Sequence, residues 1–112
     1  MKPNSLTFLQ HILGSIELIE EYLHSVSEKK FKQSPAIQDQ VLYRLMIIGE
    51  AVKNMPEAVR KQHAEIPWKA IAGMRDVLIH QYFGVDLDEV WLILTKRIPI
   101  LKKQIQEIID EL

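Results

Sequence analysis

Apolar residues recur every three or four positions over most of the chain, and this period constrains the fold more than any other feature of the sequence. Such spacing places apolar side chains on one face of an α-helix, and no strongly alternating β-branched run predicts a strand. Only 4 Gly and 5 Pro interrupt the 112 residues. With 47% hydrophobic residues, a chain of this length can build one helical core. The sequence therefore predicts a single all-α domain over residues 1–112.

Start signals locate the first two long helices. Ser5 is the expected N-cap of the first helix, which should fade at the solvated charge run 28–30. Ser34 followed by Pro35 is typical of a helix start, so a second helix is predicted from there to about Asn54. Gly49 inside that helix indicates a close approach by a neighbouring helix rather than a functional role.

The second half of the chain predicts one short helix and two long ones. The short helix covers 56–63, and Ile66-Pro67-Trp68 begins a long helix that runs to about Phe83. Gly84 is expected to end it in a left-handed conformation. Asp86 begins the last helix with the spacing of a capping box, and Pro99 should kink that helix. The predicted fold is an antiparallel bundle of four long helices plus a possible short one.

Composition narrows the possible partners and compartments. The 14 Lys and Arg against 15 Asp and Glu give a net charge of −1, so any RNA contact must be local and DNA binding is not expected. The absence of Cys excludes disulfides and thiol chemistry and fits a reducing cytosol. No signal peptide or membrane-length apolar run is present, and we expect a cytoplasmic protein without membrane contact. The four His lack metal-ligand spacing, so neither a metal nor a cofactor is expected.

Arg75 lies on the apolar side of the helix predicted over 67–83. With about 100° per residue on an ideal helix, Leu78 and Ile79 fall within about 60° of Arg75, and Tyr82 falls within about 20°. The narrow polar side of the helix comprises Lys69, Gly73, Asp76 and His80. A charged residue in an apolar sector must find a partner or face a shared interface.

Each of these residues also has a purely structural interpretation. Arg75 can pair with a buried carboxylate, for which Glu50 is a candidate. His80 near a helix C-terminus is favoured by the helix dipole, and Asp76 four residues earlier can pair with it. Tyr82 can be an amphipathic residue at the edge of the core. On residue type alone, the structural interpretation of Arg75 is favoured.

The same residues suit phosphodiester chemistry. The planar fork of an Arg matches phosphate oxygens, and a His titrates near neutral pH and can move a proton. RNA carries its own nucleophile, the 2′-hydroxyl, so cleavage needs no metal. Arg75 and His80 nevertheless point about 140° apart and lie about 7.5 Å apart along a straight helix. One copy is then an incomplete site, which two copies of the helix across a twofold axis would complete.

The segment Arg75-Asp76-Val77-Leu78-Ile79-His80-Gln81-Tyr82 resembles the R-x4-H-x-Y motif of HepT-like toxins in the HEPN superfamily. The surrounding blocks match in the family's order: Arg44-Leu45-x-Ile47-Ile48-Gly49-Glu50-Ala51, Ile66-Pro67-Trp68, Gly73-Met74-Arg75-Asp76 and Tyr82-Phe83-Gly84-Val85-Asp86. They span residues 35 to 95, most of the chain.

The resemblance implies a HEPN-like homodimer whose motifs face a shared cleft. It also implies a metal-independent endoribonuclease that is the toxin of a type VII-like toxin–antitoxin pair and cleaves tRNA or mRNA. Arg75 would hold the phosphate, His80 would be the acid and base, and Asp76 would support the site. The partner implied is a minimal nucleotidyltransferase (MNT) antitoxin, which modifies Tyr82 with AMP.

Two further interpretations stay open from the sequence. The chain can instead be a non-catalytic dimeric module that binds a nucleotide or the nucleotidyltransferase, which the near-zero net charge slightly favours. The complete set of Arg, His and Tyr favours the ribonuclease. A basic patch on the last helix is expected to be a solvated face, although guiding RNA or docking an acidic partner is the alternative; it comprises Lys96, Arg97, Lys102 and Lys103.

Overall fold

The computed structural model describes the backbone of residues 3–80, 84 and 86–112, and their side chains except at 3, 4, 75–77, 79 and 80. In this part of the chain the secondary structure is entirely helical, which confirms the predicted all-α class. None of the described helices is long and apolar enough to cross a membrane. The elements are α1 (Pro3–Tyr22), α2 (Glu28–Gln33), α3 (Pro35–Lys53), α4 (Glu57–Gln62), α5 (Trp68–His80), α6 (Leu87–Leu92), the π-helical turn η2 (Ile93–Arg97) and α7 (Ile98–Asp110).

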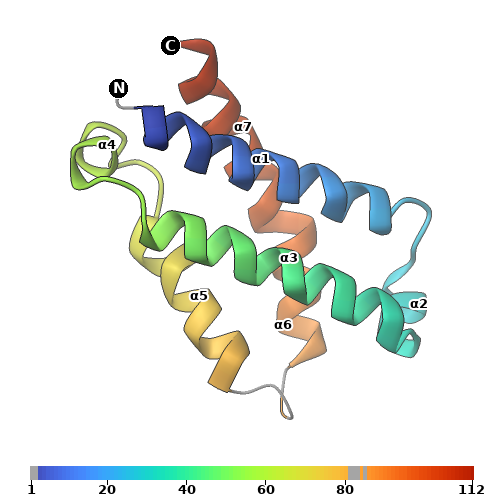
Figure 1. The fold of residues 1–112 in the computed structure, drawn as a ribbon. Coiled ribbons are helices and arrows are strands. Elements are labelled where there is room, and N and C mark those ends of the chain that lie inside the picture. Colours follow the sequence, from blue (N-terminus) through green and yellow to red (C-terminus); the bar gives the residue numbers. More distant parts are fainter. Residues whose placement is uncertain (1–2, 81–83, 85) are drawn as a thin grey trace.

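The long helices pack as an antiparallel bundle in which α3 is central. Figure 1 shows α3 running against α1 on one side and α5 on the other, and α7 also packs on α1. Leu9, Ile48 and Ile105, from three different helices, are fully buried in one continuous core. Burying such side chains stabilises the fold by about 1.5–3 kcal/mol each. The stripes of apolar residues that define the helices in the sequence are thus the residues that hold them together.

Two predicted helix starts are confirmed by their hydrogen bonds. The Ser34 side chain accepts a hydrogen bond from the backbone N–H of Ile37 at 3.3 Å, and Pro35 is the first residue of α3. The Asp86 carboxylate accepts from the backbone N–H groups of Asp88 at 3.0 Å and Glu89 at 3.3 Å. Each cap satisfies N–H groups that a helix start otherwise leaves without a partner.

The predicted start and end of the first helix are wrong. Ser5 is a buried residue inside α1, which begins at Pro3. The charge run 28–30 is the opening of a separate helix, α2, and the Lys30 N–H donates to the Ser27 side chain at 3.1 Å. The cause is tertiary: Phe31 in α2 is fully buried, and burial of an aromatic ring outweighs the polar character of the residues around it.

The prediction of a left-handed Gly84 is wrong, and the helix before Pro99 contains a π-helical turn, which is one of the usual causes of a kink. Gly84 does not adopt a positive φ, and a Cβ there would meet nothing within 4 Å. Before Pro99 the helix widens into η2, where the N–H of Ile98 donates to the carbonyl of Ile93. The wider turn relieves the clash between a proline ring and the carbonyl four residues earlier.

Candidate active site

The helix α5 contains three of the four predicted site residues. Arg75, Asp76 and His80 all belong to it, and its backbone is continuous from Trp68 to His80. The side chains of these three residues, and all of Tyr82, lie outside the described part of the structure. A continuous helix fixes the spacing of the positions, so about 7.5 Å along the axis separates 75 from 80. The backbone of α5 therefore has the spacing on which the sequence prediction rests.

Trp68 fixes the beginning of α5. Its side chain is 6% exposed, and its indole Nε1–H donates to the backbone carbonyl of His63 at 2.9 Å. The hydrogen bond joins the end of α4 to the first turn of α5, and Ile66 in the connection is buried as well. A buried indole with a satisfied N–H is a rigid anchor, because breaking the bond would leave a donor without water.

The middle of α5 packs against α3. The two helices are in contact, Leu78 between the motif positions 75 and 80 is buried, and Gly49 within α3 is buried too. The neighbouring Glu50 is exposed, and its side chain accepts from the Asn54 amide at 3.3 Å. Glu50 is therefore not a buried carboxylate, and its predicted pairing with Arg75 lies outside the described side chains.

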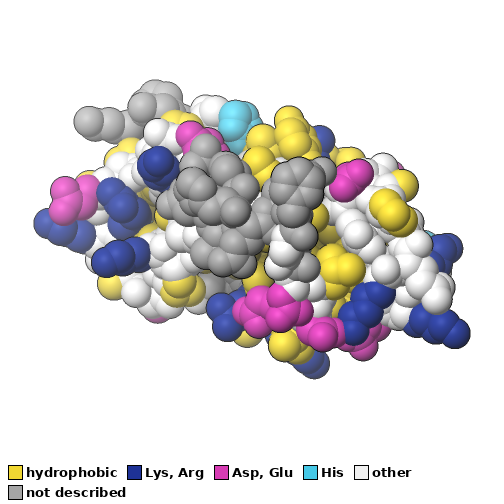
Figure 2. Space-filling model, turned by 90° about the horizontal axis from the view of Figure 1, so that it is seen from below, with side chains coloured by type: hydrophobic (Ala, Val, Ile, Leu, Met, Phe, Trp, Pro, Cys, Tyr) yellow, Lys and Arg dark blue, Asp and Glu magenta, His cyan; other side chains and the backbone are white. Residues whose placement is uncertain are grey.

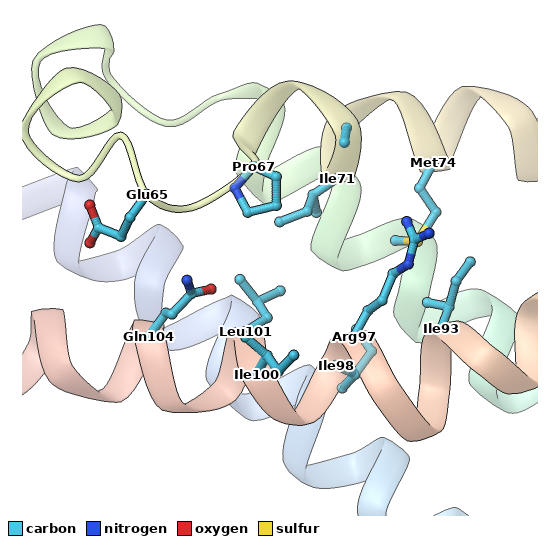
Figure 3. Close-up of a pocket in the computed structure, with 11 residues that line it drawn as sticks. Glu65, Pro67, Ile71, Met74, Ile93, Arg97, Ile98, Ile100, Leu101 and Gln104 are labelled. Atoms are coloured by element: carbon cyan, nitrogen blue, oxygen red, sulfur yellow. The ribbon is translucent and has the colours of Figure 1, made fainter.

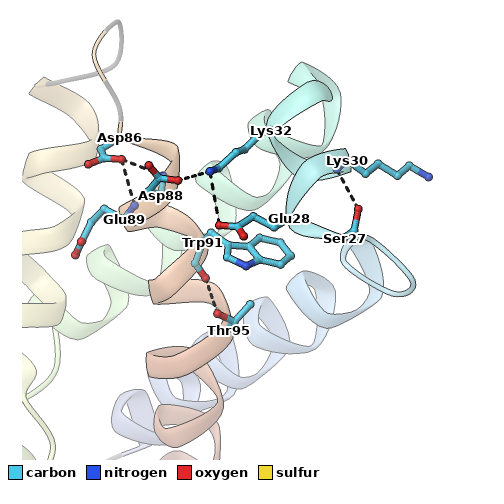
Figure 4. Close-up of polar contacts among 9 residues, drawn as sticks. All are labelled: Ser27, Glu28, Lys30, Lys32, Asp86, Asp88, Glu89, Trp91 and Thr95. Atoms are coloured by element: carbon cyan, nitrogen blue, oxygen red, sulfur yellow. Dashed lines mark hydrogen bonds and ion pairs between the residues drawn. The ribbon is translucent and has the colours of Figure 1, made fainter.

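After the motif, α2 holds the beginning of α6 in place, as Figure 4 shows. The Lys32 amine bonds the Asp88 carboxylate and also lies 3.6 Å from Glu28. The hydrogen bond to Asp88 raises the pKa of the Lys32 amine above its usual value. Below this pair the rings of Phe31 and Trp91 are 5.3 Å apart at a tilt of 34°. The chain that leaves the motif is thus anchored within one turn of Asp86.

An apolar groove between α5 and α7 adjoins the motif helix, and the sequence analysis did not identify it. Figure 3 shows Ile71 of α5 facing Leu101, and Met74 of α5 beside Ile93 with Arg97 extending toward it. The groove has a volume of about 300 Å³. Ile100, which is 62% exposed beside it, is the one sequence signal, because it is an apolar residue off the core stripe of α7. A groove of this kind suits an apolar side chain.

The antiparallel bundle and the position of the motif on α5 define a HEPN-type helical domain. The chain belongs to the family described as "Ribonuclease HepT-like", whose model matches residues 12–108. The predicted superfamily and branch are therefore confirmed.

Several relatives of this chain carry names that include a ribonuclease. A protein of Methanocaldococcus jannaschii, named "Gamma-glutamylcyclotransferase and putative RNase", is 49% identical over 112 residues, which are 100% of this chain and 50% of the relative. A "Putative RNase" of Caldanaerobacter subterraneus subsp. tengcongensis is 44% identical over 104 residues, 93% of each chain. A "Probable ribonuclease HepT" of Thermococcus cleftensis is 41% identical over 108 residues, 96% of this chain and 98% of the relative. No solved structure matches the chain significantly.

Proposed function

We propose that this protein is a metal-independent endoribonuclease and the toxin of a type VII-like toxin–antitoxin pair. One observation carries the proposal: the family match over residues 12–108 includes an α5 that bears Arg and His at the motif spacing. Relatives named as ribonucleases support the same reaction class.

The reaction uses the nucleophile that RNA supplies. His80 removes the proton of the 2′-hydroxyl, whose oxygen attacks the adjacent phosphorus. The bond from phosphorus to the 5′-oxygen breaks, and that oxygen takes the proton back from the protonated His80, which leaves a cyclic phosphate and a 5′-hydroxyl. Arg75 neutralises the charge that grows on the phosphorane oxygens, where a fixed cation is most effective, and Asp76 supports the site.

Cleavage of RNA in the presence of a chelator tests this function directly. Pure protein should cut tRNA or mRNA with EDTA present, because none of the groups in the proposed mechanism is a metal. Gel analysis of the products should show cyclic phosphate and 5′-hydroxyl ends. If RNA stays intact while the protein still binds a nucleotide or the nucleotidyltransferase, the chain is the non-catalytic module instead.

A second copy of the chain completes the proposed site. Since Arg75 and His80 point about 140° apart on α5, two helices across a twofold axis bring both residue types to one cleft. We expect a homodimer at micromolar concentration, with the apolar side of α5 forming part of the shared surface. Light scattering should give twice the mass of the 13.1 kDa chain. A monomer at that concentration would contradict the shared site.

The proposed partner is an MNT-type nucleotidyltransferase that acts as the antitoxin. Its target on this chain is the phenol of Tyr82, which follows the catalytic His by two positions. Attachment of AMP there silences the nuclease.

A further inference from the structure

We propose that a shallow basic groove between α4 and the first turn of α5 binds the RNA backbone beside the scissile phosphate. The inference rests on the ribonuclease function proposed above and names how its substrate is held. The cations of this α4–α5 groove are Arg60, Lys61 and Lys69.

The groove has an apolar floor and a basic rim. Its volume is about 770 Å³, and Ile66, Pro67 and Trp68 form part of its lining. The floor is rigid because Ile66 and Trp68 are buried and the Trp68 indole bonds the carbonyl of His63. A wide, open groove with fixed walls suits an extended chain better than a small enclosed ligand.

The rim is positive, although the chain as a whole carries a net charge of −1. Three cations face one carboxylate, Glu57, which lies 3.3 Å from Lys61 in an exposed pair that contributes little. The Arg60 Nε is buried and lacks a hydrogen-bond partner among the described residues. Lys69 is exposed and forms no ion pair in the described part of the chain. Figure 2 shows Lys and Arg side chains gathered toward the left, the side on which α4 lies in Figure 1.

The basic patch on the last helix is less suited to this role. Lys102 donates to the Glu20 carboxylate of α1 at 2.7 Å, and this hydrogen bond raises the pKa of the Lys102 amine. Part of the charge of that patch is therefore already neutralised within the protein. Among the described residues neither Arg60 nor Lys69 forms a salt bridge, and Lys69 is exposed, so the charge of the groove is not neutralised in the same way.

The groove lies along the same helix as the motif. Lys69 comes six residues before Arg75, a distance of about 9 Å along the axis. A stacked strand rises about 3.4 Å per nucleotide, so the groove is about three nucleotides from the scissile phosphate. In the sequence, position 69 also shares the polar side of α5 with positions 76 and 80. One strand can thus occupy the groove and the motif together.

Binding of an uncleavable RNA tests the groove separately from catalysis. The probe is a short single-stranded oligouridylate with 2′-O-methyl groups, which lack the nucleophile. The groove variant is Arg60→Gln, Lys61→Gln and Lys69→Gln combined. Its matched control is Lys96→Gln, Lys102→Gln and Lys103→Gln, which removes the same charge. We expect the groove variant to bind roughly tenfold more weakly, and the slope of log affinity against log salt to fall by about 2, at about 0.7 per lost phosphate contact.

Cleavage of substrates of different length gives the second readout. The groove variant should lose kcat/KM on long RNA and cut a dinucleotide as wild type does, because a dinucleotide cannot reach the groove. Equal RNA affinity of the groove and control variants would overturn the proposal. So would normal RNA binding with lost binding of the nucleotidyltransferase, which would assign the groove to the protein partner. If the triple variant unfolds, Lys69→Gln can be compared with Lys103→Gln, because Lys69 is exposed and forms no ion pair with any described residue.

If the groove binds RNA but no variant or wild type cleaves it, the proposed nuclease function fails while the groove remains a binding site.

Discussion

His80→Ala and Arg75→Ala are each expected to abolish RNA cleavage and growth inhibition. The first removes the group that is proposed to move the proton, and the second removes the cation that is proposed to stabilise the phosphorane. Losses of single groups of these kinds cost about 10²-fold or more in rate. The measurements are initial rates of cleavage with chelator present and growth of cells that express each variant. Helicity and dimer mass should stay as in wild type, because neither change removes a described core residue.

A control for this result is His24→Ala. His24 is exposed in the connection after α1, outside the α5 region, so its loss should leave the cleavage rate unchanged. Full activity in His80→Ala would instead assign the cleavage to a contaminant or to another site.

The helices that could be predicted from the sequence are those whose signals are local. The Ser34-Pro35 start and the Asp86 cap depend on residues within three positions of each other, and both form as predicted. The apolar stripe of the last helix also lies inward as its period indicates, with Val90, Leu101 and Ile105 buried. A cap and a helical period each depend on residues close together in the chain, so a single sequence is enough to predict them.

Features that depend on distant residues could not be predicted. Helix α2 is stabilised by Phe31 against Trp91 and by Lys32 with Asp88, pairs that lie more than fifty residues apart in the sequence. Nothing in the charge run 28–30 indicates these contacts. The same is true of the basic patch on the last helix. The sequence predicted a solvated face that includes Lys102, but in the fold Lys102 pairs with Glu20.

Of the candidate site, the motif could also be predicted from the sequence, whereas the groove could not. Its motif is a spacing along one helix, so the sequence placed Arg75, Asp76 and His80 together and α5 contains all three. The α4–α5 groove joins Arg60 to Lys69 across a connection whose path is set by the buried Ile66 and Trp68. Residues on two helices that a loop joins have no regular spacing in the sequence, so their proximity could not be predicted.

Tyr82→Phe is expected to give a protein that still cuts RNA but escapes silencing by the nucleotidyltransferase and ATP. In the proposed modification, the Tyr82 phenol oxygen attacks the α-phosphorus of ATP, and pyrophosphate leaves. The helix predicted from the sequence over 67–83 would place position 82 within about 20° of Arg75. The attached AMP therefore adds a negative phosphodiester and a bulky nucleotide beside the cation that RNA phosphate needs, by the electrostatics of a phosphorylation switch.

Intact-mass analysis after co-expression with the nucleotidyltransferase measures this modification. Wild type should gain mass in whole AMP units and lose its cleavage activity, whereas Tyr82→Phe should gain none and stay active. Tyr43→Phe is the control, because Tyr43 is 53% exposed on α3 and so accessible to an enzyme, yet lies outside the motif. If Tyr82 only packs against the wall of the cleft, Tyr82→Phe will resemble wild type in every assay, including silencing. Mass gains that persist in Tyr82→Phe would place the modification on another residue and exclude Tyr82 as the switch.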